Sequence, residues 1–93
     1  MTILHEWGHV VDIELLDAED RAAYLELRGF DAATKWDAIS SHRIEGWAAS
    51  PSEDFAEVMV VAWTGGDHRV RTTAPGGQPS PDVVAAVVEL TGL

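Results

Sequence analysis

Two histidines with an acidic residue between them, near the start of the chain, are the feature that most constrains its fold. They belong to the stretch His5-Glu6-Trp7-Gly8-His9. On an α-helix, residues four positions apart lie one turn apart on the same face, so His5 and His9 can reach one common point. Imidazole nitrogen is a common zinc ligand, and a catalytic zinc site takes three protein ligands and keeps a fourth position for water. The spacing therefore predicts a helix that contributes two metal ligands.

The acidic residue inside the motif has a separate role. Glu6 directly follows the first histidine, so its carboxylate can reach water held by the metal, which is where hydrolysis needs a general base. Several positions around the motif are apolar: Ile3, Leu4, Trp7, Val10 and Val11. A polar triad on a helix otherwise suited to burial needs a reason to be there. The alternative is a chance arrangement on a surface helix.

Length and composition indicate one small domain that spans residues 1–93. Apolar residues make up 46% of the chain, as in a globular protein. A core of this size supplies modest stability, to which a bound metal would add. Six basic residues against sixteen acidic ones give a net charge of −10, which argues against nucleic acid and anionic membranes as partners. If the chain is an active hydrolase of the kind that H-E-x-x-H indicates, its partner is a peptide or protein substrate. The oligomeric state is open.

The sequence also limits the other kinds of site and location. The chain has no cysteine, which excludes disulfides and thiolate metal sites. We find no apolar run long enough to span a membrane and no signal peptide, so a cytoplasmic location is the default expectation.

Start and stop signals predict four helices. Thr2 can cap a first helix over residues 3–16, and Asp17 and Asp20 begin a second over 18–28, the two forming a nearly continuous arm. A third helix starts with Ser50-Pro51 and ends at Gly65-Gly66. Pro81-Asp82 opens the last, over 83–91. Between residues 30 and 51 the periodicity is weak: 35–39 can hold a helical turn, whereas 40–42 and 46–47 are typical of loop.

The third helix supplies the remaining metal ligand. Glu53 and Glu57 lie four positions apart on one face, and Glu53 follows His9 by 44 positions, which is enough chain to fold back antiparallel to the first helix. We assign Glu53 to the metal and Glu57 to an imidazole N–H, because liganding histidines generally need such an orienting acceptor. The alternative is an acidic first turn favoured only by the helix dipole.

Taken together, these motifs resemble a known family. H-E-x-x-H at 5–9, followed by Glu53-Asp54-Phe55-Ala56-Glu57, is similar to the catalytic domain of the anthrax lethal factor and Pro-Pro endopeptidase group of zinc metallopeptidases. The resemblance implies that His5, His9 and Glu53 bind Zn²⁺, that Glu6 activates water and that Glu57 orients an imidazole. It covers nearly the whole chain. The peptidases that cleave phage-type repressors share H-E-x-x-H but usually have a shorter interval, so they rank lower.

The chain departs from that family in two ways. Family members carry a tyrosine six or seven positions before the glutamate ligand, where its hydroxyl stabilises the oxyanion, but this chain has Gly46-Trp47 there. The only tyrosine is on the arm helix. Oxyanion or substrate contact would then fall to Zn²⁺ itself or to one of a few side chains: Trp47, His42, His68 or Arg69. The second departure is the absence of the sheet and helix that precede H-E-x-x-H in the family, as in a domain truncated at its N-terminus.

The expected fold is therefore mainly α: a small zincin-like domain with an active-site helix, an arm helix, a ligand helix and a closing helix, lacking the usual N-terminal sheet. The expected function is peptide-bond hydrolysis by water activated on Zn²⁺, with Glu6 as general base. Two alternatives remain. One is a catalytically impaired zinc-binding remnant or interaction module, and the other is an acidic helical protein without a metal.

Overall fold

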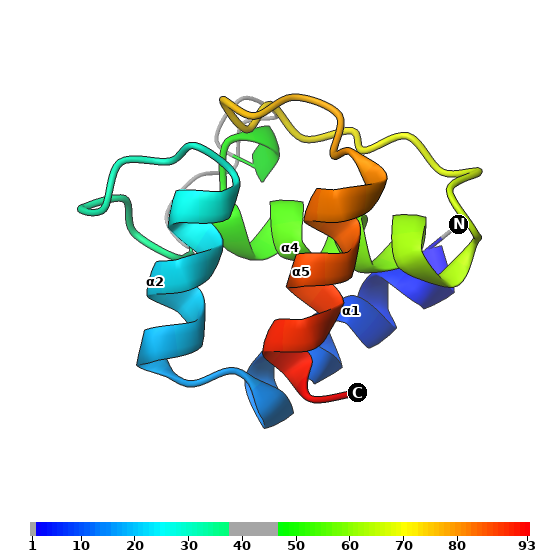
Figure 1. Ribbon diagram of the computed structural model, residues 1–93, viewed down its shortest axis with the longest axis horizontal. Coiled ribbons are helices and arrows are strands. Elements are labelled where there is room, and N and C mark those ends of the chain that lie inside the picture. Colours follow the sequence, from blue (N-terminus) through cyan, green and yellow to red (C-terminus); the bar gives the residue numbers. More distant parts are fainter. Residues whose placement is uncertain (1, 38–46) are drawn as a thin grey trace.

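The computed structural model describes residues 2–37 and 47–93 (Figure 1). Within them lie four principal helices: α1 (Thr2–Leu15), α2 (Ala18–Leu27), α4 (Pro51–Trp63) and α5 (Pro81–Thr91). No strand occurs in these two ranges. The mainly helical class is confirmed, and each helix begins and ends within a few residues of its predicted bounds.

Helix α4 is the centre of the fold. Almost every residue from Pro51 to Val61 is buried, so this helix is covered on all sides rather than along one stripe. Helix α1 packs against α4 and runs in roughly the opposite direction, while α5 covers another side and also contacts α2 (Figure 1). The core that results is one cluster of buried apolar side chains, in which Phe55, Val58 and Met59 of α4 join Val11 of α1 and Val87 of α5.

Local sequence signals explain where α4 begins and ends. Ser50 is the N-cap and Pro51 occupies the first turn, where a missing N–H costs nothing. Two acidic residues in the same turn, Glu53 and Asp54, interact favourably with the helix dipole. Gly65 and Gly66 follow the helix with φ of +66° and +94°, a conformation that favours glycine.

The chain turns sharply between α1 and α2, so the predicted continuous arm is wrong (Figure 1). The reason is local: Asp17 caps α2 in a capping box with Asp20, and this requires an extended backbone at Asp17. The carboxylate of Asp12 stabilises the turn. It accepts from Arg21 Nε at 3.0 Å and from Trp36 Nε1 at 2.8 Å.

A buried polar cluster joins α2, α4 and the loop before α5. The carboxylate of Asp54 is fully buried and accepts hydrogen bonds from Tyr24 Oη at 2.5 Å and Arg28 Nε at 2.8 Å. Thr72 Oγ1 also donates to it. The Nη2 atom of Arg28 then donates to the Gly77 carbonyl at 2.6 Å. This cluster holds the 65–80 loop against the helices.

Two local predictions between the helices are wrong. Residues 35–37 are not helical, and Trp36 is instead held by its bond to Asp12. Trp47, expected in a loop, lies together with Ala48 in a helical turn that leads to Ser50. The rest of the predicted turn and the predicted loop at 40–42, with His42, lie outside the described residues.

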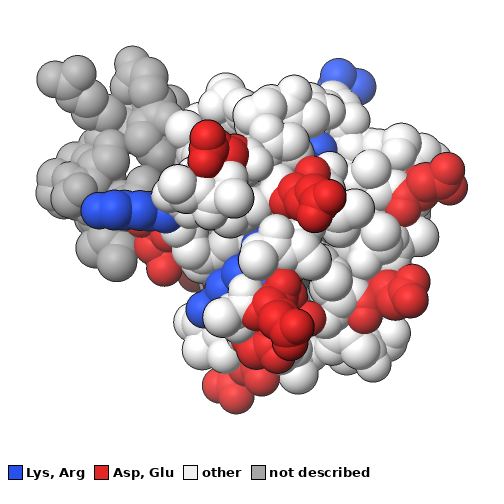
Figure 2. Space-filling view, turned by 60° about the vertical axis from the view of Figure 1, so that its left-hand side comes forward, with Lys and Arg blue, Asp and Glu red and all other residues white. Residues whose placement is uncertain are grey.

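Among the charged residues, acidic ones predominate. Figure 2 shows one face on which Asp and Glu side chains are scattered and outnumber Lys and Arg, as the net charge of −10 requires. None of the described helices has both the length and the apolar character needed to cross a membrane.

Candidate metal centre

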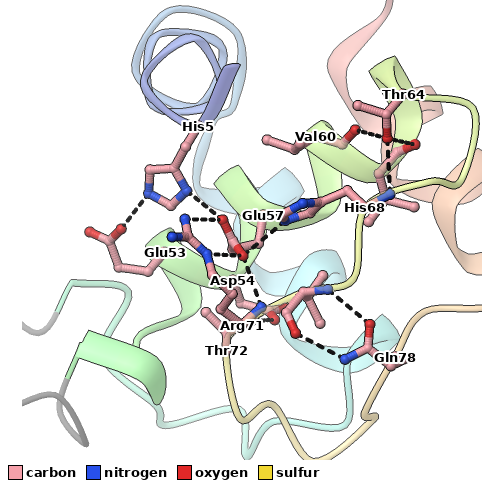
Figure 3. Close-up of polar contacts among 12 residues, drawn as sticks. His5, Glu53, Asp54, Glu57, Val60, Thr64, His68, Arg71, Thr72 and Gln78 are labelled. Carbon is pink, nitrogen blue, oxygen red and sulfur yellow. Dashed lines mark hydrogen bonds and ion pairs between the residues drawn. The ribbon is translucent and has the colours of Figure 1, made fainter. Parts of the chain in front are cut away.

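Helices α1 and α4 bring four polar side chains together at their contact. His5 and His9 lie one turn apart on α1, and Glu53 and Glu57 lie one turn apart on α4. Because the helices are antiparallel, His5 meets Glu57 while His9 meets Glu53 (Figure 3 shows the first of these contacts). The side chains of His5 and Glu57 lie deepest.

Three potential ligand atoms converge at the outer part of this cluster. Oε1 of Glu53 lies 2.8 Å from Nε2 of His5 and 3.0 Å from Nε2 of His9, and the two nitrogens are 3.1 Å apart. Ligand atoms around a tetrahedral zinc ion are separated by about 3.3 Å, given metal–ligand bonds of about 2.0–2.1 Å. A shift of a few tenths of an ångström would therefore fit the triangle to such an ion. His5, His9 and Glu53 could hold a metal ion.

The carboxylate of Glu57 lies behind this triangle, fully buried, and accepts hydrogen bonds at both oxygens. Oε2 lies 2.8 Å from His5 Nδ1, and Oε1 lies 3.0 Å from His68 Nε2 (Figure 3). Arg71 donates to both oxygens. Burial alone would raise the pKa of Glu57, but the bonds from Arg71, His68 and His5 outweigh it and lower that pKa to about 2. Glu57 is therefore a carboxylate at neutral pH.

The ionised carboxylate of Glu57 determines that Nδ1 of His5 carries a proton. A carboxylate only accepts, so the facing Nδ1 must carry the proton. In the neutral imidazole the other nitrogen, Nε2, then has a free lone pair. That lone pair faces the lone pairs of Glu53 Oε1, 2.8 Å away. Two acceptors at this distance repel unless a cation or a proton lies between them, and a metal ion at the centre of the triangle would supply that charge.

The triangle opens to solvent on one side. The side chain of His5 is 7% exposed, whereas those of His9 and Glu53 are 25% and 22% exposed. A metal ion held by these three residues would thus have buried protein behind it and solvent in front. This arrangement suits a site with three protein ligands and one free position.

The structure places the other predicted site residues differently. Trp47 stacks on the His5 ring, with ring centroids 5.8 Å apart and planes at 26°. His68 lies behind Glu57, on the side away from the three ligand atoms, and Arg69 is exposed on the following position. His42 lies outside the described residues.

Glu6 lies on the exposed side of α1, next to the site. It makes no hydrogen bond to another described residue and borders a shallow hollow of about 240 Å³, with Ile3, Trp7 and Val10 as its other walls. At about 100° per residue, Glu6 stands on the helix between His9 and this apolar strip. Its carboxylate is adjacent to the ligand cluster and accessible to water.

No protein-family model matches this chain, and neither a curated protein nor a solved structure matches it.

Three further residues complete the site, and the sequence motifs did not identify them. Arg71 supports Glu57 from a loop 14 positions away. Gly8 lies inside H-E-x-x-H and Ala56 inside the α4 motif, and the two residues face each other so closely that a Cβ on Gly8 would stand 2.7 Å from the Ala56 Cα. Gly8 and Ala56 are each the fourth residue of their five-residue motifs, His5–His9 and Glu53–Glu57. Small residues at these matching positions are a signal in the sequence that the two helices contact each other. Arg71 carried no comparable signal, because its partner is set by the path of a loop.

Proposed function

We propose that this chain carries a zinc-dependent hydrolytic centre of the metallopeptidase type. The observation that carries the proposal is the convergence of His5 Nε2, His9 Nε2 and Glu53 Oε1 within 3.1 Å of one another. Two imidazoles and one carboxylate form a donor set typical of catalytic zinc sites. The order of the motifs along the chain supports the likeness to the lethal factor and Pro-Pro endopeptidase group.

Each residue has a defined task in this proposal. His5, His9 and Glu53 hold the ion, which when bound would polarise a carbonyl and lower the pKa of a coordinated water to about 7. Glu6 takes a proton from the attacking water and passes it to the leaving amine, so the peptide bond breaks into a carboxylate and an amine. Glu57 keeps the His5 ring in place.

Zinc is proposed over other metals because of the ligands. Imidazole also suits copper, nickel and iron, and two histidines with one carboxylate also bind iron(II), but Glu6 directly after the first histidine ligand is typical of zinc hydrolases. Magnesium and calcium prefer oxygen-only sites. The metal that is retained through purification without added metal, identified by elemental analysis, tests this choice.

A second function has one observation in its favour. Glu6 stands beside an exposed apolar strip of Ile3, Trp7 and Val10. Because no other described element covers this strip, no described residue faces Glu6 there to hold a substrate in place. Positioning contributes a large part of enzymatic catalysis. The alternative is therefore a metal-binding module with little turnover.

Zinc content and peptide cleavage, measured on the same preparation, separate these functions. A peptidase binds one zinc per chain and cleaves a mixed peptide library, and Glu6→Gln abolishes cleavage while keeping the zinc. A binding module keeps the zinc and shows no cleavage in either form. Absence of any bound metal, together with no binding of added Zn²⁺, would overturn both.

A further inference from the structure

A mostly apolar pocket lies between the end of α4, the 65–80 loop and α5, and none of the proposed metal ligands lines it. Val61 of α4 faces Val84 and Val88 of α5 across it. The two α5 valines lie one turn apart and are only half-buried, so an apolar ligand would complete their burial. The volume is about 640 Å³. Pockets for small molecules typically measure about 300–1,000 Å³, so a small organic molecule fits here.

The charge of this pocket is opposite to that of the chain. Arg69 lines it, and none of the described residues that line it is acidic, although the chain has sixteen acidic residues. The nearest acids along the chain, Asp67 and Asp82, are exposed and do not belong to the lining. Arg69 is itself exposed and makes no ion pair with a described residue. An apolar pocket with one uncompensated guanidinium is complementary to an apolar molecule with one negative charge.

The loop that carries Arg69 is held in place on both sides of it. Nε2 of His68 lies 3.0 Å from Oε1 of Glu57 (Figure 3). Val70 makes two bonds to the Gln78 side chain: its N–H donates to Oε1 at 2.8 Å, and its carbonyl accepts from Nε2 at 2.9 Å. This wall of the pocket is therefore formed in the ligand-free chain, and binding does not have to order it.

We propose that this pocket is a binding site for a small carboxylic acid with an apolar tail. The tail packs on Val61, Val84 and Val88, and the carboxylate pairs with Arg69. A guanidinium presents two parallel N–H groups, which match the two oxygens of one carboxylate. The site is separate from the metal centre, so its occupancy requires no metal.

Methyl NMR of the full chain with octanoate tests the proposal, because octanoate joins a carboxylate to an aliphatic tail. Titration should shift the methyl signals of Val84 and Val88 until they saturate. A chelator is present throughout, since a carboxylate can also bind a metal ion. Leu27 is the internal control: it lies in another groove, between α2 and α5, which also contains Glu26 and Glu89 and should reject an anion. Absence of a saturable shift at both valines would overturn the proposal.

Two further probes separate the tail from the charge. Octanamide keeps the tail without the charge and should bind about two- to fivefold more weakly than octanoate, the range expected for one exposed ion pair. Acetate keeps the charge with almost no tail and should cause no saturable shift at the same concentrations. Equal affinities for octanoate and octanamide would contradict the selection of an anion.

Arg69→Gln tests the partner of the carboxylate. It should weaken octanoate binding by about two- to fivefold and leave octanamide binding unchanged. Lys35→Gln is the matched control, because Lys35 is also an exposed cation but does not line the pocket. It should change neither affinity. Wild-type affinity for octanoate in Arg69→Gln would show that Arg69 does not bind the carboxylate.

Ala85→Trp tests the location of the tail. Ala85 is exposed on α5 and lines the pocket, so an indole there should fill the space and abolish octanoate binding. Ala22→Trp, at an exposed alanine of α2 outside the pocket, should bind octanoate as the wild type does. Undiminished binding to Ala85→Trp would place the ligand elsewhere and overturn the proposal. If Ala85→Trp fails to fold by circular dichroism, the methyl shifts and Arg69→Gln decide.

Zinc binding and octanoate binding fail independently. A wild-type chain that binds octanoate in this pocket but takes up no zinc would reject the proposed function and support this inference. A chain that takes up zinc but gives no saturable shift at Val84 and Val88 would do the reverse.

Discussion

Gly8 of α1 lies directly against Ala56 of α4. A Cβ atom built on Gly8 would stand 2.7 Å from the Ala56 Cα and 2.9 Å from its carbonyl oxygen, closer than side chains pack. This contact falls between His5 and His9 on one helix and between Glu53 and Glu57 on the other. The absence of a side chain at Gly8 therefore sets the helix separation that lets the four polar groups meet.

Gly8→Ala should damage both the fold and the site. Alanine favours a helix by about 1 kcal/mol over glycine, yet the clash is with backbone, which cannot rotate away, and overpacking typically costs about 1–3 kcal/mol. We expect net destabilisation in urea unfolding and a loss of zinc affinity. Removing the Ala56 methyl in the Gly8→Ala, Ala56→Gly double variant should not restore either, because the closest atoms are backbone. A fully stable Gly8→Ala protein would show that the helices can separate freely.

The helices were predictable because their signals are local. Pro51, Pro81 and the capping pair Asp17 and Asp20 act within one turn, and these starts were placed correctly to within a few residues. The prediction of a continuous arm was wrong, and the reason is again local. The extended backbone at Asp17, which caps α2, also ends the helical path of α1. Trp36 was expected in a helical turn, but a hydrogen bond to Asp12, 24 positions earlier, decides its place.

In the candidate site, too, the residues set by local spacing were predictable and those set by the path of a loop were not. His5, His9, Glu53 and Glu57 were predicted from spacing, since helical periodicity alone puts each pair on one face. Arg71 and the buried Asp54 cluster were not, because their contacts depend on how the loop before α5 crosses the helices. The sequence placed Tyr24 on the arm helix but did not indicate that Asp54 would become its buried partner.

Alkaline pH should unfold the protein through Tyr24. Burial, and then the negative charge of Asp54, raises the pKa of Tyr24 well above its usual value of about 10. Because the folded pKa lies above the unfolded one, this contribution to stability is complete below pH 10 and is lost as pH rises through the folded value. Tyr24 is the only tyrosine, so tyrosinate absorbance reports it alone. It should appear together with loss of helical circular dichroism, well above pH 10. Ionisation near pH 10 in a folded protein would contradict the burial.

Glu6→Gln should separate catalysis from metal binding. The carboxylate touches none of the proposed ligand atoms, so zinc occupancy and melting temperature should stay near wild type. A general base typically contributes about 10²–10⁴ in rate, so any peptidase activity should fall by that factor. We expect little turnover from the isolated chain on a mixed peptide library. Robust wild-type cleavage that disappears in Glu6→Gln would favour the enzyme over the binding module.

Metal removal should lower the stability of the fold. Binding at a thousand times the dissociation constant adds about 4 kcal/mol to the native state, and each kcal/mol shifts the melting temperature of a domain this size by about 4–8 °C. A chelator should therefore reduce the melting temperature of the zinc-loaded wild type substantially. His5→Ala should show no such shift, and a wild type that melts identically with and without chelator would indicate that no metal is bound in the folded state.

The direct test of the central claim is zinc titration of the wild type beside Glu53→Ala and Glu57→Ala. Glu53 Oε1 lies within 3.0 Å of both Nε2 atoms, whereas the one contact of Glu57 with a proposed ligand residue is to Nδ1 of His5, the nitrogen that faces away from the triangle. We predict one zinc ion per wild-type chain, no measurable binding in Glu53→Ala, and binding weakened by about 10- to 100-fold in Glu57→Ala. A reversed order of the two variants would exchange the roles of the glutamates. A wild-type chain that takes up no zinc would contradict the metal centre itself.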